Sequence, residues 1–232
     1  MKCPVIILTL LVLGAALGAA LDESDLLKAR DHQDRAALEK MAAESHALAD
    51  KQPNDAAAQY RFALAESYSA EVAIEVHDKA GAKNAAQAGM DAATKAVSMK
   101  PDSGEYQRIL GTLCGQMISG SSLAGLKYGK CALDAVDKAI ELDPKSSMAY
   151  LSHGVGNFYL PQAFGGGIEL AIKDFRRAIE LNAKNADAWL WLGVALRKSN
   201  QAAEAQKAFE QSLQINPNRV WAKQQLEKTP GS

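Results

Sequence analysis

Apolar residues along this chain recur at intervals of three and four, the spacing that places side chains on one face of a helix. The pattern is clearest in residues 185–217. A first face there consists of Trp189, Leu192, Gly193 and Leu196, and a second of Ala205, Phe209, Ser212 and Leu213. Ser199 and Asn200 interrupt the pattern between the two faces, and Pro217 follows the second, where it cannot continue a helix. The segment predicts two helices joined by a short turn.

This two-helix pattern occurs four times, with a period that shortens along the chain. The positions that close successive units lie 48, 43, 39 and 34 residues apart, at Pro53, Pro101, Pro144, Ala183 and Pro217. The three earlier units carry 14, 9 and 5 residues more than the last, at the point where the first helix turns into the second. The extra residues predict either a common edge offered to a partner, or longer helices and neutral loops.

The residues of the last unit resemble the tetratricopeptide repeat family. Its pattern of a large apolar residue, Leu-Gly, a small residue, an aromatic residue, Ala and Pro is matched at all positions but one by Trp189, Leu192, Gly193, Ala205, Phe209 and Pro217. Ser212 stands where the family usually has Ala. Diverged copies precede it in phase, so the resemblance covers residues 54–217 and is closest to an exported bacterial type. It implies an all-α fold, a TPR-like right-handed α-solenoid of about four helix pairs with flanking helices.

The division of the chain follows from these units. Residues 1–20 are predicted to be a signal peptide, and 21–53 an N-terminal helical segment. The repeats are assigned to 54–101, 102–144, 145–183 and 184–217, followed by a capping helix at 218–229 and a tail at 230–232.

The first twenty residues differ from the rest of the chain. Lys2 gives a positive start, residues 4–20 are uncharged and mostly apolar, and Gly18 and Ala20 stand three residues and one residue before the expected cleavage point. This pattern is typical of a secretory signal peptide and predicts export, most simply to a periplasm. The alternative is an uncleaved membrane anchor, for which a run of about 17 residues is at the short limit.

Composition narrows the classes of partner and chemistry. The 26 Lys and Arg nearly balance the 27 Asp and Glu, so the chain lacks the basic excess of a nucleic-acid-binding protein. The four His form no i, i+4 pair, and no phosphate-binding loop or catalytic set is visible. We therefore expect no metal, no cofactor, no membrane span after signal cleavage and no enzymatic activity.

Two cysteines would remain after signal cleavage, Cys114 and Cys131. Export would place them in an oxidising compartment, where a pair can form a disulfide. Two small buried thiols are the alternative, since sequence alone does not fix the geometry that a disulfide needs.

The resemblance also implies a binding surface, because the first helices of such repeats line a concave groove. The groove positions rich in aromatic and basic residues, which are common at binding hot spots, are Tyr60, Arg61, Tyr68, Arg108, Gln116, Phe158, Tyr159, Trp191, Arg197 and Lys198. Some of them could instead pack on a neighbouring helix.

The predicted function is that of an exported, non-enzymatic scaffold that binds a protein or peptide segment in the concave groove. The alternative is a small-ligand-binding or transporter accessory protein of the cell envelope, which would need an enclosed cavity. The stretch Gly165–Gly167, which follows Leu160 and Pro161, resembles loops of some exported transport-partner proteins and is also explained as a helix break.

Overall fold

The computed structural model describes residues 22–118 and 122–229. All regular structure in these residues is helical, so the all-α prediction is confirmed. The predicted signal peptide and tail, residues 1–20 and 230–232, lie outside the described residues.

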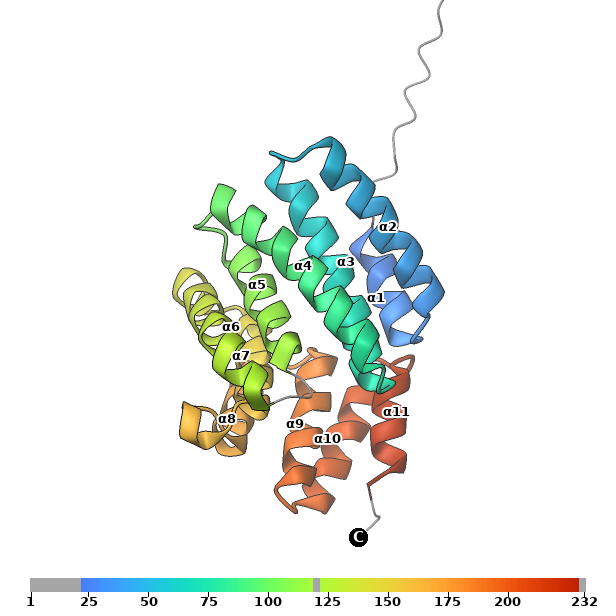
Figure 1. The fold of residues 1–232 in the computed structure, drawn as a ribbon. Coiled ribbons are helices and arrows are strands. Elements are labelled where there is room, and N and C mark those ends of the chain that lie inside the picture. The colour runs from blue at the N-terminus through green and yellow to red at the C-terminus, as the bar shows by residue number, and fades with distance from the viewer. Residues whose placement is uncertain (1–21, 119–121, 230–232) are drawn as a thin grey trace, which may run out of the picture.

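The described residues form eleven α-helices and one 3-10 helix, η1 (Figure 1). The N-terminal pair is α1 (Glu23–Asp31) and α2 (Arg35–Lys51). Four further pairs follow: α3 (Ala56–Glu75) with α4 (Lys79–Met99), α5 (Gly104–Ile118) with α6 (Ser122–Leu142), α7 (Ser147–Tyr159) with α8 (Ile168–Leu181), and α9 (Ala186–Lys198) with α10 (Ala202–Ile215). The 3-10 helix η1 (Gln162–Phe164) lies between α7 and α8, and α11 (Val220–Glu227) ends the stack.

Short polar side chains start most of these helices. At seven N-termini an Asp, Ser or Asn accepts a hydrogen bond from a backbone N–H of the first turn, namely Asp22, Asp34, Asp55, Asp78, Ser103, Ser146 and Asn185. Each such cap stabilises its helix by about 1 kcal/mol. Three turns between helices use a residue with positive φ, Gln33, His77 and Asn200, which reverses the chain within a few residues.

The extra residues of the earlier units are mostly helical. Helices α3 and α4 have 20 and 21 residues, whereas α9 and α10 have 13 and 14. The first unit therefore gains about two turns on each helix and keeps a short connection. In the third unit the helices are again 13 and 14 residues long, and the extra residues form the connection around η1. Gly165 and Gly167 have φ of 87° and 127° there, which glycine adopts without strain.

Glycines on the first helices allow the two helices of a unit to approach closely. A Cβ placed on Gly193 would lie 2.6 Å from the ring of Phe209, and one on Gly154 would lie 2.5 Å from the ring of Phe175. Both phenylalanines are fully buried. The repeat pattern of a small residue opposite an aromatic residue is therefore a packing requirement.

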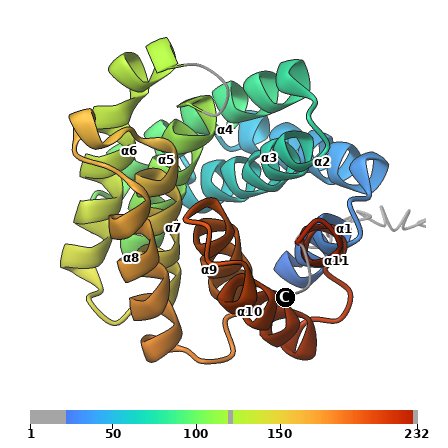
Figure 2. The same cartoon turned by 90° about the horizontal axis from the view of Figure 1, so that it is seen from below.

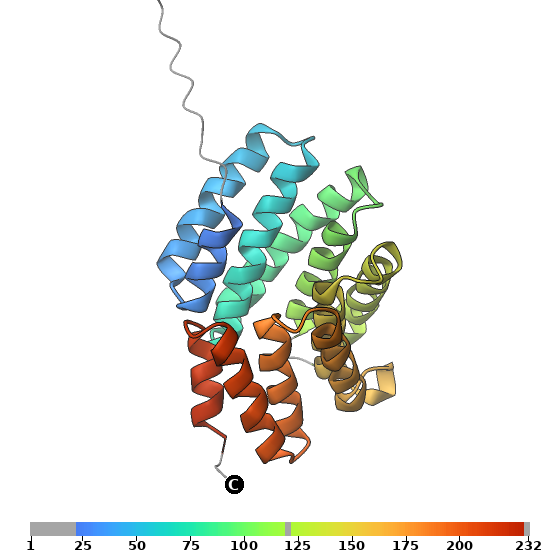
Figure 3. The same cartoon turned by 180° about the vertical axis from the view of Figure 1, so that it is seen from behind.

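The superhelix turns far enough for its two ends to meet. Seen along the axis in Figure 2, the C-terminal helix α11 lies beside α1 at the start of the chain, and α9 lies on the inner side of the ring. The view from behind shows α10 and α11 next to α1 and α3 (Figure 3). This closure determines how much of the concave surface is open.

A disulfide links the two helices of the second unit. Cys114 on α5 and Cys131 on α6 are bonded, with their Cα atoms 5.9 Å apart. Cys114 is fully buried and Cys131 half-buried. The bond holds the N-terminal half of α6 against α5.

Gly154→Ala tests the packing requirement. We expect it to lower the free energy of unfolding by about 1–3 kcal/mol, because the added methyl group overlaps Phe175. Gly156→Ala is the matched control on the same helix, where no atom lies within 4 Å of the added Cβ. It should stabilise the protein by about 0.5–1 kcal/mol through helix propensity. Urea denaturation measures both, and shifts of the same sign would contradict this account.

Candidate functional site

The concave side of the superhelix encloses a cavity of about 100 Å³, here called the inner cavity. Most of its lining comes from α1, α3, α5, α7 and α9, with Ala132 and Leu133 of α6 completing it. Charged and aromatic side chains line it together, among them Arg30, Tyr68, Arg108, Tyr159 and Trp191. The groove predicted from the repeat pattern is therefore narrow in this structure.

Six charged residues close the ring beside this cavity: Arg30, Asp31, Glu71, Glu75, Asp187 and Arg219, here called the closing network. Arg219, just before α11, has a fully buried side chain. Its guanidinium donates to both carboxylate oxygens of Glu75 and, over 2.7 Å, to Glu71 Oε1. Its Nε lies 3.5 Å from Asp187 Oδ1. One side chain thus joins the C-terminus to α3 and α9.

Arg30 makes the corresponding contacts from α1. Its Nη1 donates to Asp187 Oδ2 over 2.7 Å, and its Nε and Nη2 donate to Asp31 Oδ1 over 3.0 and 2.6 Å. The guanidinium lies 5.4 Å from the centre of the Tyr68 ring, within reach of a cation–π interaction. Asn216, at the end of α10, donates to Asp31 Oδ2 over 2.7 Å. The first and last helices are therefore joined through shared carboxylates.

The closing network contains four carboxylates and two guanidinium groups. Burial raises the pKa of Glu71 to about 7, against the opposing effect of Arg30 and Arg219. Burial also raises the pKa of Asp187, but the guanidinium groups of Arg30 and Arg219 outweigh this effect and bring that pKa below its ordinary value. Glu71 thus takes up a proton more readily than an ordinary glutamate.

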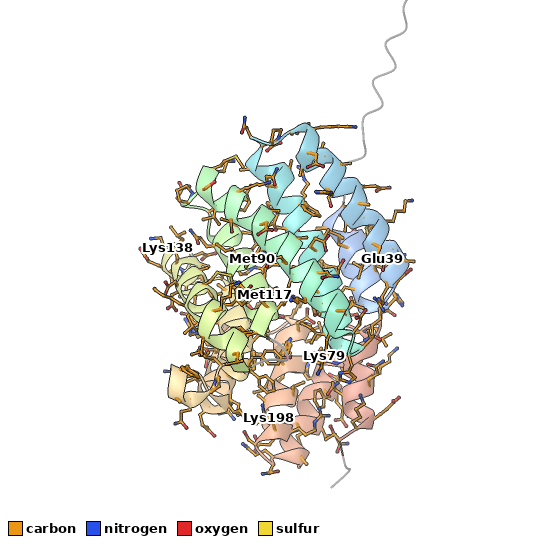
Figure 4. The ribbon with its side chains drawn as sticks, in the orientation of Figure 1. Glu39, Lys79, Met90, Met117, Lys138 and Lys198 are labelled. Atoms are coloured by element: carbon orange, nitrogen blue, oxygen red, sulfur yellow. A yellow bond between two sulfur atoms is a disulfide. The ribbon has the colours of Figure 1, made fainter. Side chains whose placement is uncertain are left out.

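An aromatic cluster lies where α7 and α9 meet, formed by Phe158, Tyr159, Trp191 and Trp221. Trp191 is its centre, with ring centroids 5.7 Å from Phe158, 6.0 Å from Tyr159 and 5.1 Å from Trp221. The exposed ammonium group of Lys198, a residue labelled in Figure 4, lies 4.5 Å from the centre of the Phe158 ring. Phe158 is half-buried, so aromatic surface and a positive charge meet solvent together.

Arg108 lines the inner cavity from α5. It forms two hydrogen bonds to Glu105, of 2.7 and 2.5 Å, and its Nη1 lies 3.4 Å from Ser152 Oγ. Tyr60 donates its hydroxyl hydrogen to the same Glu105 over 2.9 Å and stacks on Tyr106. These contacts use the charge of Arg108 within the protein.

The ten groove residues predicted from the sequence separate into two sets. Five line the inner cavity: Tyr68, Arg108, Gln116, Tyr159 and Trp191. The other five, Tyr60, Arg61, Phe158, Arg197 and Lys198, do not. Arg197 turns towards the C-terminal cap, where it donates to Gln225 O over 3.0 Å, and Gln116 donates to Ser67 O over 2.9 Å.

The closing network was not predicted from the sequence. Glu71 and Glu75 follow Leu64 and Tyr68 at the helical spacing of four, three and four residues, so the buried face of α3 continues into two carboxylates. This continuation is the sequence signal from which the two buried carboxylates could have been predicted. The partner Arg219 lies 144 residues from Glu75 in the sequence, and no local pattern connects them.

His153 has the partners expected of a satisfied core histidine. Its Nδ1 lies 3.0 Å from Asp174 Oδ2 and its Nε2 lies 3.4 Å from Asp137 Oδ1. Burial lowers the pKa of His153, but the two carboxylates outweigh it and raise the pKa above its ordinary value. The part of the chain that the structure describes contains no group of three His, Cys, Asp or Glu arranged for a metal ion. Nor does any helix there have the length and apolar character to cross a membrane.

Comparisons with known proteins agree with this architecture. The family model described as "Regulator of microtubule dynamics protein 1-3" matches residues 20–160, and two tetratricopeptide repeat models match residues 165–200 and 186–219. Among solved structures, a TPR protein of Thermus thermophilus, TTC0263, is similar, with a TM-score of 0.61 and 15% identity over 88% of this chain and 98% of that chain. This likeness shows a shared fold.

Two curated relatives match part of the chain. Anaphase-promoting complex subunit 3 of Schizosaccharomyces pombe is 31% identical over 87 residues, and protein O-mannosyl-transferase TMTC1 of Homo sapiens is 31% identical over 99 residues. The matches cover 38% and 42% of this chain but only 12% and 11% of those proteins.

Arg219→Met tests the closing network. We expect it to lower the free energy of unfolding by about 3–5 kcal/mol, because it leaves Glu71 and Glu75 buried without their shared cation. Arg176→Met is the control, since Arg176 forms an exposed pair with Glu204 and should contribute less than about 1 kcal/mol. Urea denaturation gives the two values, and equal losses would show that the network does not hold the ends together.

Proposed function

The chain belongs to the regulator of microtubule dynamics protein 1-3 family, and from this premise we propose that it is a non-enzymatic scaffold that binds a segment of a partner protein. The observation that carries the proposal is the aromatic cluster at the junction of α7 and α9, with Phe158 and Lys198 reaching solvent. Aromatic side chains beside a basic group are the usual anchors of protein interfaces.

In this proposal the partner segment binds at the edge of the concave surface around Phe158 and Lys198, here called the rim. Four members of the closing network line the inner cavity, whose volume of about 100 Å³ has room for a single side chain of the partner. Lys198, as the exposed cation at the rim, favours a segment that carries an acidic residue next to an apolar one. The proposed contact thus lies at the edge of the predicted groove and not on its floor.

The volume of the inner cavity weighs against a small-ligand carrier. Pockets that enclose drug-sized ligands have volumes of about 300–1,000 Å³. The inner cavity is several times smaller than most of these, and its charged residues are already bound to one another. The inner cavity therefore supports a protein partner better than an enclosed small ligand.

The scaffold is further proposed to act outside the cytosol. Two features support this: the apolar start with small residues before Leu21, and the bonded pair Cys114–Cys131. The family description refers to microtubules, which belong to the cytosol. Export and a microtubule partner are therefore competing expectations for this chain.

Loss of partner binding in a rim variant tests the scaffold. Proteins cross-linked to the tagged chain in its own host are identified, produced in pure form and measured against the wild type. We expect Phe158→Ala with Lys198→Glu to weaken binding at least about tenfold, because both anchors are lost.

Lys207→Glu is the matched control for that experiment, since Lys207 is exposed on α10 and is absent from the inner cavity and the aromatic cluster. Circular dichroism establishes that the double variant is folded. A partner that binds the double variant as tightly as the wild type would refute the rim assignment.

The mass of the natural protein tests export. We expect mass spectrometry of the protein from its own host to give a chain that begins at Leu21 and is two mass units lighter than the reduced form, because the disulfide removes two hydrogens. A chain that keeps residues 1–20 and carries free thiols would favour the cytosol and make tubulin the first partner to assay.

A further inference from the structure

A second concave surface, here called the outer groove, lies on the convex side of the first repeat unit. Its volume is about 710 Å³, and it is bounded by α2 and α4 with α3 as its floor. Figure 1 shows α3 between these two helices, and Figure 4 views the same face, with Glu39 labelled on α2 and Lys79 at the first turn of α4. The outer groove shares no lining residue with the inner cavity.

All three helices present residues to the outer groove at alternating intervals of three and four. On the floor these are Gln59, Phe62, Glu66, Ser69 and Ala73. The walls contribute Arg35, Glu39, Ala42, His46 and Ala49 from α2, and Gly81, Asn84, Ala88, Asp91 and Lys95 from α4. This is the spacing by which helices in a bundle meet a further helix lying along them. The outer groove therefore has the form of a four-helix packing from which one helix is missing.

Small side chains make the outer groove wide enough for a helix. Eight of its twenty lining residues are Ala or Gly, from both walls and the floor. The floor stripe from Gln59 to Ala73 corresponds to about 21 Å along the axis of α3. A helix of about fifteen residues has the same length. Small residues on the walls also let a partner backbone come close to α2 and α4.

Glu66 stands at the middle of the floor without a protein partner. It forms no hydrogen bond or ion pair with the described residues. Burial raises the pKa of its carboxyl group. A half-buried carboxylate without a partner is costly, and a basic side chain entering the outer groove would relieve that cost.

The remaining charges around the outer groove favour the same kind of partner. Glu39 and Asp50 on α2 and Asp91 on α4 are acidic and exposed. Of the basic residues, Arg35 is bound to Asp78 over 2.6 Å at one end, which leaves Lys95 near the other. Acidic side chains therefore outnumber Lys and Arg among the residues that line the outer groove.

We propose that the outer groove is a docking site for an α-helix of a partner protein, which packs small or aliphatic side chains against the three helices and places a Lys or Arg on Glu66. This surface is separate from the aromatic cluster, so the proposal does not depend on the function proposed above. Residues 4–20 of this chain contain no basic residue and do not supply such a helix.

The protonation of Glu66 gives the docking a pH dependence. Burial raises the pKa of Glu66 to about 7, so the free protein gains a proton there below neutral pH. A basic partner requires the carboxylate, and its affinity should therefore fall as the pH falls through 7, by about tenfold between pH 8 and pH 6. Other titratable or charged groups also face the groove and act on the same partner, so the Glu66→Gln variant is needed to isolate the effect. They are Arg35, Glu39, His46, Asp50, Asp91 and Lys95.

Selection from a displayed peptide library tests the proposal. The probe is a library of 18-residue helical peptides with Ala and Leu on one face and all amino acids allowed at the central position of that face. We expect selection against the full chain to give binders with Lys or Arg at the centre. Their affinity should fall at least tenfold on Glu66→Gln, which should also remove the pH dependence, whereas Glu44→Gln, on an exposed part of α2 outside the groove, leaves the affinity unchanged.

A blocking variant distinguishes this site from others. Ser69→Trp fills the middle of the floor and should abolish binding, while Thr94→Trp, exposed on α4 outside the outer groove, should not. The proposal is overturned if selection yields no binder, if the binders are indifferent to Ser69→Trp, or if their central residue is not basic. It is equally overturned if sedimentation shows a dimer of the chain that Ser69→Trp dissociates, because a second copy would then be the occupant.

Discussion

The guanidinium group of Arg219 is the contact on which the shape of the molecule depends. It is fully buried and shared by carboxylates of α3 and α9, while Arg30 joins the same carboxylates to α1. A solenoid has no intrinsic reason to close, because each repeat contacts only its neighbours. Here charges from both ends of the chain meet in a region of low dielectric, where an unpaired partner is costly. Once the rotation of the repeats has brought the two ends together, this network holds the ring closed beside the small inner cavity.

Closure also determines which surfaces remain for partners. The concave surface is reduced to the inner cavity and the rim near Trp191, so several predicted groove residues serve the protein itself. Arg108 is bound to Glu105, and Arg197 to the C-terminal cap. The long helices α3 and α4 extend the convex side instead and form the outer groove with α2. The extra turns of α3 and α4 thus lengthen a convex groove that the shorter helices α8, α9 and α10 also form, with a smaller volume of about 550 Å³.

The repeat pattern was sufficient to predict the fold, because it records local packing. Gly154 and Gly193 face Phe175 and Phe209 within one unit, and such contacts join residues about twenty positions apart. The site was harder to predict. Trp191 and Tyr159 were identified from aromatic residues at groove positions, but the packing of Trp191 on Trp221 depends on the final helix returning to the ring. Glu66 was invisible to the pattern, since a charged residue on a helix is usually on the solvated face.

The sequence by itself determined the helices, their pairing into repeats and the all-α solenoid, because caps, periodicity and small-to-large packing act over short distances along the chain. It also specified two cysteines that could bond. Only the tertiary structure decided that they do, that Arg219 meets Glu75 across 144 positions, and that α2 and α4 leave a groove open over α3. The contact between Arg219 and Glu75 depends on the accumulated rotation from repeat to repeat. That rotation is set by the packing of every interface together, so no single segment encodes it.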